Sequence, residues 1–160
     1  MSSFDDAFIA LIGNEGSYAN NPADPGAETM WGVTARVARA HGYTGPMRDL
    51  PLATAKTIAK IEYWDRASCD KLDPRVAFQV FDSIYNGGPA IKWLQLAAKV
   101  TPDGVIGPLT LAAVAAVDPV TVITRFNAYR LKYLSSLPTW STFSRGWTDR
   151  IANNLLKGSA

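Results

Sequence analysis

The 160-residue sequence has few of the residues that crosslink a fold or hold a metal ion. Its single cysteine, Cys69, has no partner for an internal disulfide, and we interpret it as a small buried hydrophobic residue. Its single histidine, His41, is predicted to lie at a helix end, where the helix dipole favours it. One histidine and one distant cysteine do not make a zinc site, so neither a metal nor another cofactor is expected.

Long apolar runs and a strong charge imbalance are also missing. No segment approaches the roughly 18 consecutive apolar residues that a membrane helix needs. The N-terminal residues 2–6 include Asp5 and Asp6 and lack the basic start of a signal peptide, so neither a membrane anchor nor ordinary secretion is expected. The net charge of +2 is too small to indicate nucleic acid as the main partner, and no helix has the basic and amide side chains of a recognition helix.

Apolar residues recur at spacings of three and four in nearly every long segment, which predicts a mostly α-helical protein. At this length, with 48% hydrophobic residues, we expect one compact unit over residues 1–160. The predicted helices cover residues 3–15, 34–41, 53–65, a segment from Asp73-Pro74 to Gly87, a short segment around Trp93, residues 109–117, a long segment after Asp118-Pro119, and residues 140–156. Tyr63 is predicted to face inward in the third helix, and Tyr129 and Leu131 in the long helix.

Residues 16–34 are rich in glycine and proline and poor in helical periodicity. They predict an irregular segment or a small β-hairpin between the first two helices. Loops of this length in a compact domain usually carry function.

Glu15 ends the first predicted helix on the same apolar stripe as Leu11 and Ile12. Apolar surroundings raise the pKa of an isolated carboxyl group, which then keeps its proton near neutral pH. A general acid in glycoside hydrolysis needs this property, and the following loop offers Asp24 and Glu28 as a second carboxylate. The alternative is that Glu15 pairs with a lysine or arginine at a helix end, and its position alone does not exclude this.

Three groups of short motifs resemble glycoside hydrolase family 108 over nearly the whole chain. The N-terminal signature of the family is matched by Glu15-Gly16-Ser17-Tyr18, Asn20-Asn21-Pro22-Ala23-Asp24-Pro25-Gly26, Thr29 and Trp31-Gly32-Val33-Thr34. Its peptidoglycan-binding region is matched by Tyr63-Trp64-Asp65, Phe81-Asp82-Ser83, Asn86-Gly87-Gly88-Pro89, Trp93-Leu94-Gln95 and Asp103-Gly104-Val105-Ile106-Gly107-Pro108. Its C-terminal pattern is matched by Phe143-Ser144-Arg145-Gly146-Trp147 and Arg150-Ile151. One departure is Glu28, a charged residue where the family loop often has alanine.

The resemblance implies a lysozyme-like fold, with a catalytic part in residues 1–69 and a helical peptidoglycan-binding part in residues 70–160 that completes the core. The family comprises N-acetylmuramidases, found among phage endolysins and secretion-linked bacterial murein hydrolases. It therefore implies hydrolysis of the β-1,4 bond between N-acetylmuramic acid and N-acetylglucosamine. Glu15 would be the catalytic acid, and Asp24 and Thr29 are candidates for placing the attacking water.

The same resemblance implies a phage endolysin that is made in the host cytoplasm. A phage holin or another route would give it access to the cell wall. Its expected partner is peptidoglycan, and its expected state is a monomer.

Four further residues are candidates for binding the substrate. Tyr18 and Trp31 lie in the segment that follows Glu15, and aromatic faces pack well on pyranose rings. Asn86 precedes two glycines, and its amide could hold a hydroxyl or N-acetyl group, whereas asparagine is also common at helix ends for local reasons. Tyr85 lies on an apolar stripe, so packing is the alternative interpretation for it.

Three other functions stay open at this stage. A non-catalytic peptidoglycan-binding or secretion-helper protein would keep the fold without the reaction, although the intact Glu15 segment argues against it. A helix-turn-helix nucleic-acid protein lacks a suitable recognition helix. A lytic transglycosylase differs from a hydrolase only in its product, and a retaining or inverting outcome depends on a carboxylate separation that the sequence does not give.

Overall fold

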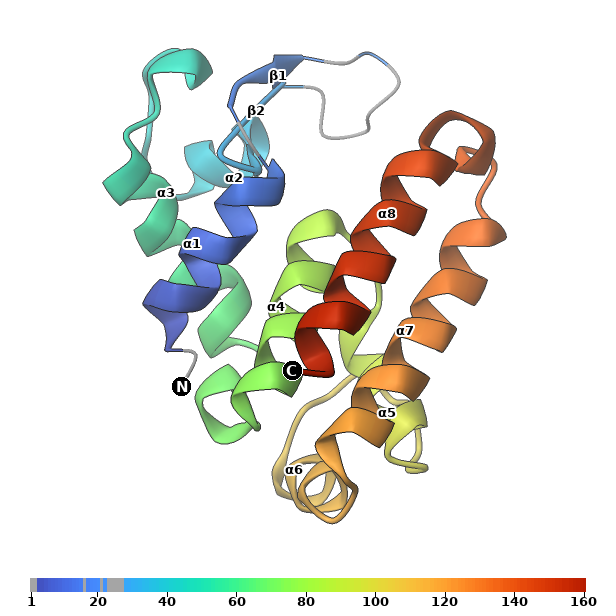
Figure 1. Cartoon of the computed structure of the whole chain (residues 1–160). Helices are drawn as coiled ribbons and strands as arrows, with labels where there is room; N and C mark the ends of the chain where they lie inside the picture. Colours follow the sequence, from blue (N-terminus) through green and yellow to red (C-terminus); the bar gives the residue numbers. More distant parts are fainter. Residues whose placement is uncertain (1–2, 16, 21, 23–27) are drawn as a thin grey trace. The chain divides into compact units, whose positions relative to one another are not determined.

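The computed structural model of the chain describes residues 3–15, 17–20, 22 and 28–160, with the backbone alone for residues 13–15. The chain forms two compact units, Ser2–Arg66 and Ala67–Ala160, which we call the N-terminal and C-terminal units. Helices dominate both, and one small antiparallel sheet lies in the N-terminal unit (Figure 1). The prediction of a mostly α-helical, lysozyme-like fold with a small β segment near residues 16–34 is confirmed.

The N-terminal unit consists of short helices and a three-stranded sheet in which β2 is the central strand. In chain order its elements are α1 (Phe4–Glu15), β1 (Ala19–Asn20), β2 (Glu28–Met30), β3 (Val33–Thr34), α2 (Ala35–Ala40), the 3-10 turn η1 (Met47–Asp49), α3 (Leu52–Ala59) and the π-helical segment η2 (Lys60–Asp65). β2 pairs antiparallel with both neighbours, so that Thr29 lies opposite Ala19 on one side and Thr34 on the other.

The first helix follows directly from its sequence. At its start the Asp6 N–H donates to Ser3 Oγ, and the Ser3 N–H donates to Asp6 Oδ2, both at 3.4 Å, which satisfies donors that a helix end leaves open. Its buried face consists of Phe4, Ala7, Phe8 and Leu11. The predicted helix over residues 3–15 is therefore confirmed to within one residue.

The helix predicted over residues 53–65 changes its hydrogen-bonding pattern in the middle. It is α-helical in α3 and π-helical from Lys60 onward. A π turn bonds residue i to i+5 and so holds more residues per turn than an α turn, which moves the buried stripe along the sequence. The inward position predicted for Tyr63 is met only in part, because Tyr63 is half-buried and Trp64 is the fully buried side chain.

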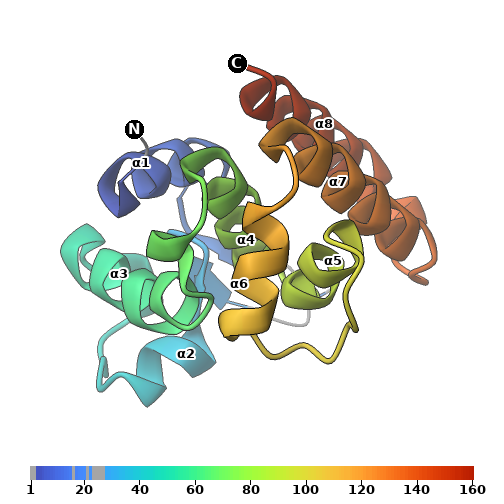
Figure 2. The same ribbon diagram turned by 90° about the horizontal axis from the view of Figure 1, so that it is seen from below.

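The C-terminal unit is built from helices alone. Its elements are the 3-10 turn η3 (Cys69–Lys71), α4 (Pro74–Asn86), α5 (Ala90–Ala97), α6 (Pro108–Ala115), α7 (Pro119–Ser135) and α8 (Trp140–Gly158). α4 contacts α5, α7 and α8, and α5 contacts α6 and α7. α7 and α8 run antiparallel side by side (Figures 1 and 2). Asp73 and Asp118 cap α4 and α7, each followed by proline in the first turn, as the sequence predicts.

The long helix α7 has a more polar inner face than the sequence predicts. Its buried residues include Val122, Phe126 and Leu134, but Leu131 is 38% exposed, so the inward position predicted for Leu131 is wrong. Asn127 and Arg130 are buried instead, because α4 presents polar partners to them. Among the described residues, no single helix is both long and apolar enough to cross a membrane, and only the bent pair α6 and α7 reaches that length and composition together.

Candidate active site

Glu15 is the last residue of α1 and stands at the point where the chain leaves the helix for the sheet. One turn before it, Leu11 is fully buried, and in a helix a residue four positions later lies on the same face. The side chain of Glu15 lies outside the described residues, as does the whole of Asp24. Their assignment as catalytic acid and water-positioning group stays a prediction.

Thr29 lies at the centre of the sheet. It is the middle residue of β2 and is half-buried between Ala19 of β1 and Thr34 of β3. Two strand neighbours fix its backbone, which gives its hydroxyl a defined position in the segment that follows Glu15. This is a suitable place for a group that orients water, and that role also stays a prediction.

Tyr18 and Glu28 form a polar pair across the sheet. The Tyr18 hydroxyl donates to Glu28 Oε1 at 3.0 Å, and the Arg48 guanidinium from η1 lies 5.1 Å from the centre of the Tyr18 ring. Glu28 is therefore a partner that holds Tyr18 in place, a contact that spacing along the sequence could not reveal. Tyr18 itself is half-buried, and its predicted contact with substrate is untested.

Trp31 occupies an unusual backbone position. Trp31 and Gly32 connect β2 to β3 and both have positive φ, 53° and 75°, as in the tight hairpin turns that usually place asparagine or glycine there. The indole N–H of Trp31 donates to the Leu50 carbonyl at 3.1 Å, which anchors the turn against the segment after η1. Strained non-glycine residues of this kind are often found at functional sites, so the geometry agrees with a wall-binding role without testing it.

Tyr85 and Asn86 belong to the C-terminal unit, at the end of α4. Tyr85 exposes only 8% of its surface and packs edge-on against Phe81, with ring centres 5.6 Å apart. Asn86 is half-buried and is followed by Gly87, whose φ of 85° ends the helix as predicted. The proposed site residues thus come from both units, with Tyr18, Thr29 and Trp31 in the N-terminal one.

A buried ionic network in the C-terminal unit was not predicted from the sequence. The carboxylate of Asp82 on α4 is fully buried and accepts hydrogen bonds from Arg130 Nη1 at 2.9 Å, from Arg150 Nη2 at 2.8 Å and from Asn154 Nδ2 at 2.6 Å. Next to it, Gln79 Nε2 donates to the Asn154 carbonyl at 2.8 Å. The network joins α4 to both α7 and α8, and the only signal in the sequence is a charged residue on the apolar stripe of α4.

The arginines determine the ionisation of Asp82. Burial is the largest single influence and raises the pKa of this carboxyl group. Arg150, Arg130 and the hydrogen bond from Asn154 together lower it by more, so the pKa of Asp82 lies below its ordinary value. The group is therefore a stable anion at neutral pH, suited to holding helices together rather than to exchanging protons.

A second polar cluster fixes the Asp103-Gly104 turn before α6. The amide of Gln95 donates to Asp103 Oδ1 at 2.7 Å and to Thr110 Oγ1 at 3.1 Å, and the Gly104 N–H donates back to Gln95 Oε1 at 2.9 Å. Hydrogen bonds from the Val105 N–H and from Gln95 keep the pKa of Asp103 below its ordinary value. These hydrogen bonds give the Asp103-Gly104 motif a role in folding, because they fix the turn that leads into α6.

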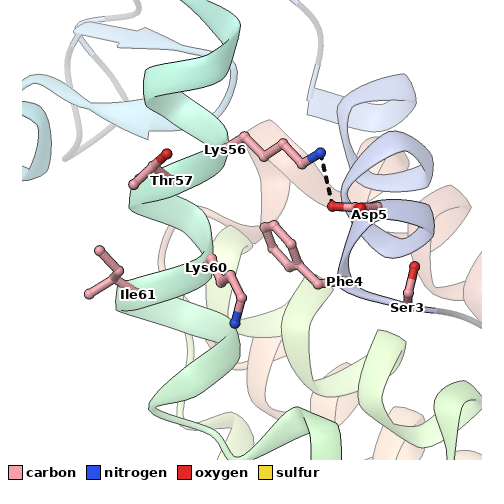
Figure 3. A pocket seen from close by; sticks show the side chains of 7 residues that line it. All are labelled: Ser3, Phe4, Asp5, Lys56, Thr57, Lys60 and Ile61. Atoms are coloured by element: carbon pink, nitrogen blue, oxygen red, sulfur yellow. Dashed lines mark ion pairs between the residues drawn. The ribbon is translucent and has the colours of Figure 1, made fainter.

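A hollow in the N-terminal unit lies away from Glu15. It is about 370 Å³ in volume and is lined by Phe4 and Asp5 of α1 and by Lys56, Thr57 and Ile61 of α3 and η2 (Figure 3). Lys56 Nζ lies 2.9 Å from Asp5 Oδ1. The hollow is at the first turn of α1, and the helix rise of about 1.5 Å per residue puts Glu15 roughly 16 Å further along. In the part of the chain that the structure describes, no group of three or more His, Cys, Asp or Glu residues could hold a metal ion.

Comparison with known protein families gives a match for each half of the chain. Residues 8–88 match the profile described as Glycosyl hydrolase 108, which covers half of the chain. The protein belongs to the glycosyl hydrolase 108 family. Residues 89–152 match a predicted peptidoglycan domain, and no curated protein matches the chain. Among solved structures, the fold is similar to that of Brucella abortus SagA, with 32% sequence identity and a TM-score of 0.88 over 97% of this chain and 92% of that one.

Membership of glycosyl hydrolase family 108 makes the protein a glycoside hydrolase, and the second domain makes peptidoglycan its partner. The family profile covers every predicted site residue, from Glu15 to Asn86. The peptidoglycan domain covers α5, α6 and α7 and all but the last turns of α8.

Proposed function

We propose that this glycosyl hydrolase 108 protein is a muramidase that hydrolyses the β-1,4 bond between N-acetylmuramic acid and N-acetylglucosamine. The observation that carries the proposal is the position of Glu15, at the C-terminal end of α1, four residues after the buried Leu11 and inside the matched family segment. The sheet that follows it supplies Thr29 and the anchored Trp31 within the same unit.

In this proposal Glu15 protonates the oxygen that leaves the anomeric carbon as the glycosidic bond breaks. Asp24 or Thr29 orients the water whose oxygen forms the new bond to that carbon. The proton that this water loses passes to the Asp24 carboxylate or, through solvent, back to the Glu15 carboxylate. Within the N-terminal unit, Tyr18 and Trp31 contact the sugars. Tyr85 and Asn86 are the candidates for sugar contacts in the C-terminal unit. Glu28 is bound by Tyr18 and keeps that ring in place, so a direct part in the reaction is not assigned to it.

The test uses purified protein and insoluble peptidoglycan, with new reducing ends and product masses as the readouts. The wild type is expected to release muropeptides with ordinary reducing ends. Glu15→Gln is expected to lower the rate by at least about a hundredfold, the lower range for loss of a general acid. Products with anhydro-muramic ends would instead identify a lytic transglycosylase, and no products at all would identify a binding protein.

A matched control separates loss of the acid from damage to α1. Asp5→Asn removes one carboxylate from the first turn of the same helix, where the side chain is 66% exposed and pairs with Lys56. It is expected to keep full activity. If Asp5→Asn and Glu15→Gln lower the rate equally at equal thermal stability, Glu15 is not the catalytic acid.

We further propose that the protein serves as a phage endolysin, made in the host cytoplasm and admitted to the wall by a holin or another route. Expression in a bacterial host is then expected to leave the cells intact until a holin is co-expressed, when turbidity falls. Glu15→Gln with the same holin should not clear the culture. Lysis by the wild type without a holin would contradict the dependence on release.

A further inference from the structure

A shallow, open depression of about 540 Å³ runs along α8 from Trp140 to Ala152, and the residues that line it all belong to this helix. Its lining residues recur at helical spacing and combine one aromatic ring with two charges and two hydroxyl groups: Trp140, Ser144, Arg145, Thr148, Asp149 and Ala152. We call it the α8 groove. From Trp140 to Ala152 the helix rises about 18 Å, which is enough to contact successive units of a polymer. All six residues lie within the segment that matches the peptidoglycan domain.

The aromatic end of the groove is held in position by its neighbours. The Trp140 ring lies 6.1 Å from the Trp147 ring, and Trp147 lies 5.4 Å from Phe143, centre to centre. All three rings are only half-buried. The rings are tilted by 37° and 33° against one another, and their contacts restrict the Trp140 side chain before a ligand binds. Less side-chain freedom is then lost on binding, which favours affinity.

The charged end of the groove carries two groups of opposite sign that do not pair with each other. Arg145 and Asp149 are exposed and four residues apart, a spacing at which helix side chains can meet. Within the described residues neither forms an ion pair, and Asp149 accepts only a hydrogen bond of 3.3 Å from Asn153. A guanidinium binds carboxylates in a bidentate manner, and a carboxylate accepts from ammonium groups.

We propose that the α8 groove binds one muropeptide unit of the peptidoglycan strand. Trp140 stacks on a sugar ring, Arg145 binds a carboxylate of the stem peptide, and Asp149 accepts from a free side-chain amino group of the stem peptide. Peptidoglycan combines sugar rings, carboxylates and amino groups within one repeating unit, and this combination matches the groove. The inference rests on the proposed function because it takes peptidoglycan as the substrate, and it adds a subsite outside the Glu15 region.

The experiment measures binding of the full-length chain to insoluble peptidoglycan sacculi, with Glu15→Gln as the background so that the ligand is not consumed. Arg145→Gln and Trp140→Ala are each expected to raise the Kd about tenfold, which corresponds to about 1.4 kcal/mol. In the active protein, Arg145→Gln is expected to raise KM and leave kcat unchanged, as for loss of uniform binding. Lys132→Gln, which removes an exposed positive charge from α7, is the matched control and should leave Kd within about twofold.

A second ligand separates the sugar from the peptide. Asp149→Asn is expected to weaken binding to intact sacculi and to leave binding to amidase-treated glycan, which has lost its stem peptides, unchanged. An equal effect on both ligands would overturn the assignment of the amino group to Asp149. If Trp140→Ala misfolds, Arg145→Gln still tests binding at the α8 groove, because the Arg145 side chain is exposed and its replacement should not disturb folding.

The inference and the proposed function fail in different ways. Sacculus binding that falls no more in Arg145→Gln than in Lys132→Gln overturns the α8 groove, while release of reducing ends by the wild type keeps the muramidase. If the wild type releases no reducing ends but its binding to sacculi depends on Arg145, the α8 groove is supported and the muramidase proposal is rejected. A chain that does not bind sacculi at all overturns the groove.

Discussion

Replacement of Asp82 by asparagine is the sharpest test of what holds the C-terminal unit together. The side chain keeps its size but loses its charge and one of its two acceptor oxygens. Arg130, which exposes 1% of its side chain, and Arg150, which exposes 12%, would then lie against a neutral amide. The helices α4, α7 and α8 would lose their common anion.

The expected loss in the free energy of unfolding depends on how deeply the Asp82 ion pairs are buried, more than on their lengths. Removing one partner of a buried ion pair typically costs about 3–5 kcal/mol, because the remaining charge stays desolvated, whereas exposed pairs contribute about 0–1 kcal/mol. Asp82 is fully buried, so the larger range applies. For a chain of this length each kcal/mol corresponds to about 2–4 °C in Tm, which gives a loss of about 6–20 °C.

Urea unfolding followed by far-UV circular dichroism and by tryptophan fluorescence measures the change on the full chain. Asp149→Asn is the control, because it removes a carboxylate from an exposed position on α8 and should change stability by less than about 0.5 kcal/mol. A loss below about 1 kcal/mol in Asp82→Asn would refute the reasoning. So would a double-mutant cycle with Arg130→Met that shows additive costs, since contacting charges should couple.

Two further predictions concern acid and the turn before α6. Because the pKa of Asp82 is lowered in the folded state, its stabilisation is complete above its unfolded pKa of about 3.9 and is lost as the pH falls through the folded value. The difference in urea midpoint between wild type and Asp82→Asn should therefore be the same at pH 7 and pH 5 and smaller at pH 3, and a constant difference at all three pH values would contradict this. Gln95→Leu removes the Gln95 hydrogen bonds to the Gly104 N–H and the Asp103 carboxylate and should lower the free energy of unfolding by about 1–3 kcal/mol, measured in urea. An unchanged midpoint would show that the turn does not depend on Gln95.

The helices could be predicted because each carries its own signals. The Ser3 cap, the Asp73-Pro74 and Asp118-Pro119 starts and the Gly87 stop act over a few residues, and the structure uses all of them. Apolar spacing supplied the buried faces of α1 and α4. Local chemistry of this kind is readable in a single sequence.

The errors arise where a distant partner overrides the local pattern. Leu131 has the right spacing for the inner face of α7, but Arg130 is buried there instead. Arg130 pairs with Asp82, which lies 48 residues earlier in the chain. In η2 the fully buried side chain is Trp64 rather than Tyr63, because the chain changes from an α to a π turn at Lys60. No residue in that segment signals this change. The spacing of apolar residues along the sequence therefore predicts neither long-range polar pairing nor a change of helical period.

The same limit applies to the candidate site. Glu15 could be picked out because an acid on an apolar stripe at a helix end conflicts with its local environment, and such conflicts are frequent at functional sites. The contacts that hold Tyr18 and Trp31 could not, because Glu28, Arg48 and Leu50 reach them across the sheet from other segments. The sequence thus indicates which residue could react, while the structure shows how its neighbours are held.

α8 shows how stability and binding can be divided within one helix. Arg150 and Asn154 point inward and bind Asp82, whereas Arg145 and Asp149 line the groove on another face. Residues 145 and 150 are five positions apart, so the helical period separates their side chains by more than a quarter turn. A change at Arg150 should therefore lower the free energy of unfolding, and a change at Arg145 should raise the Kd for peptidoglycan at unchanged stability. Loss of both properties from either change alone would mean that the groove and the ionic network form a single site.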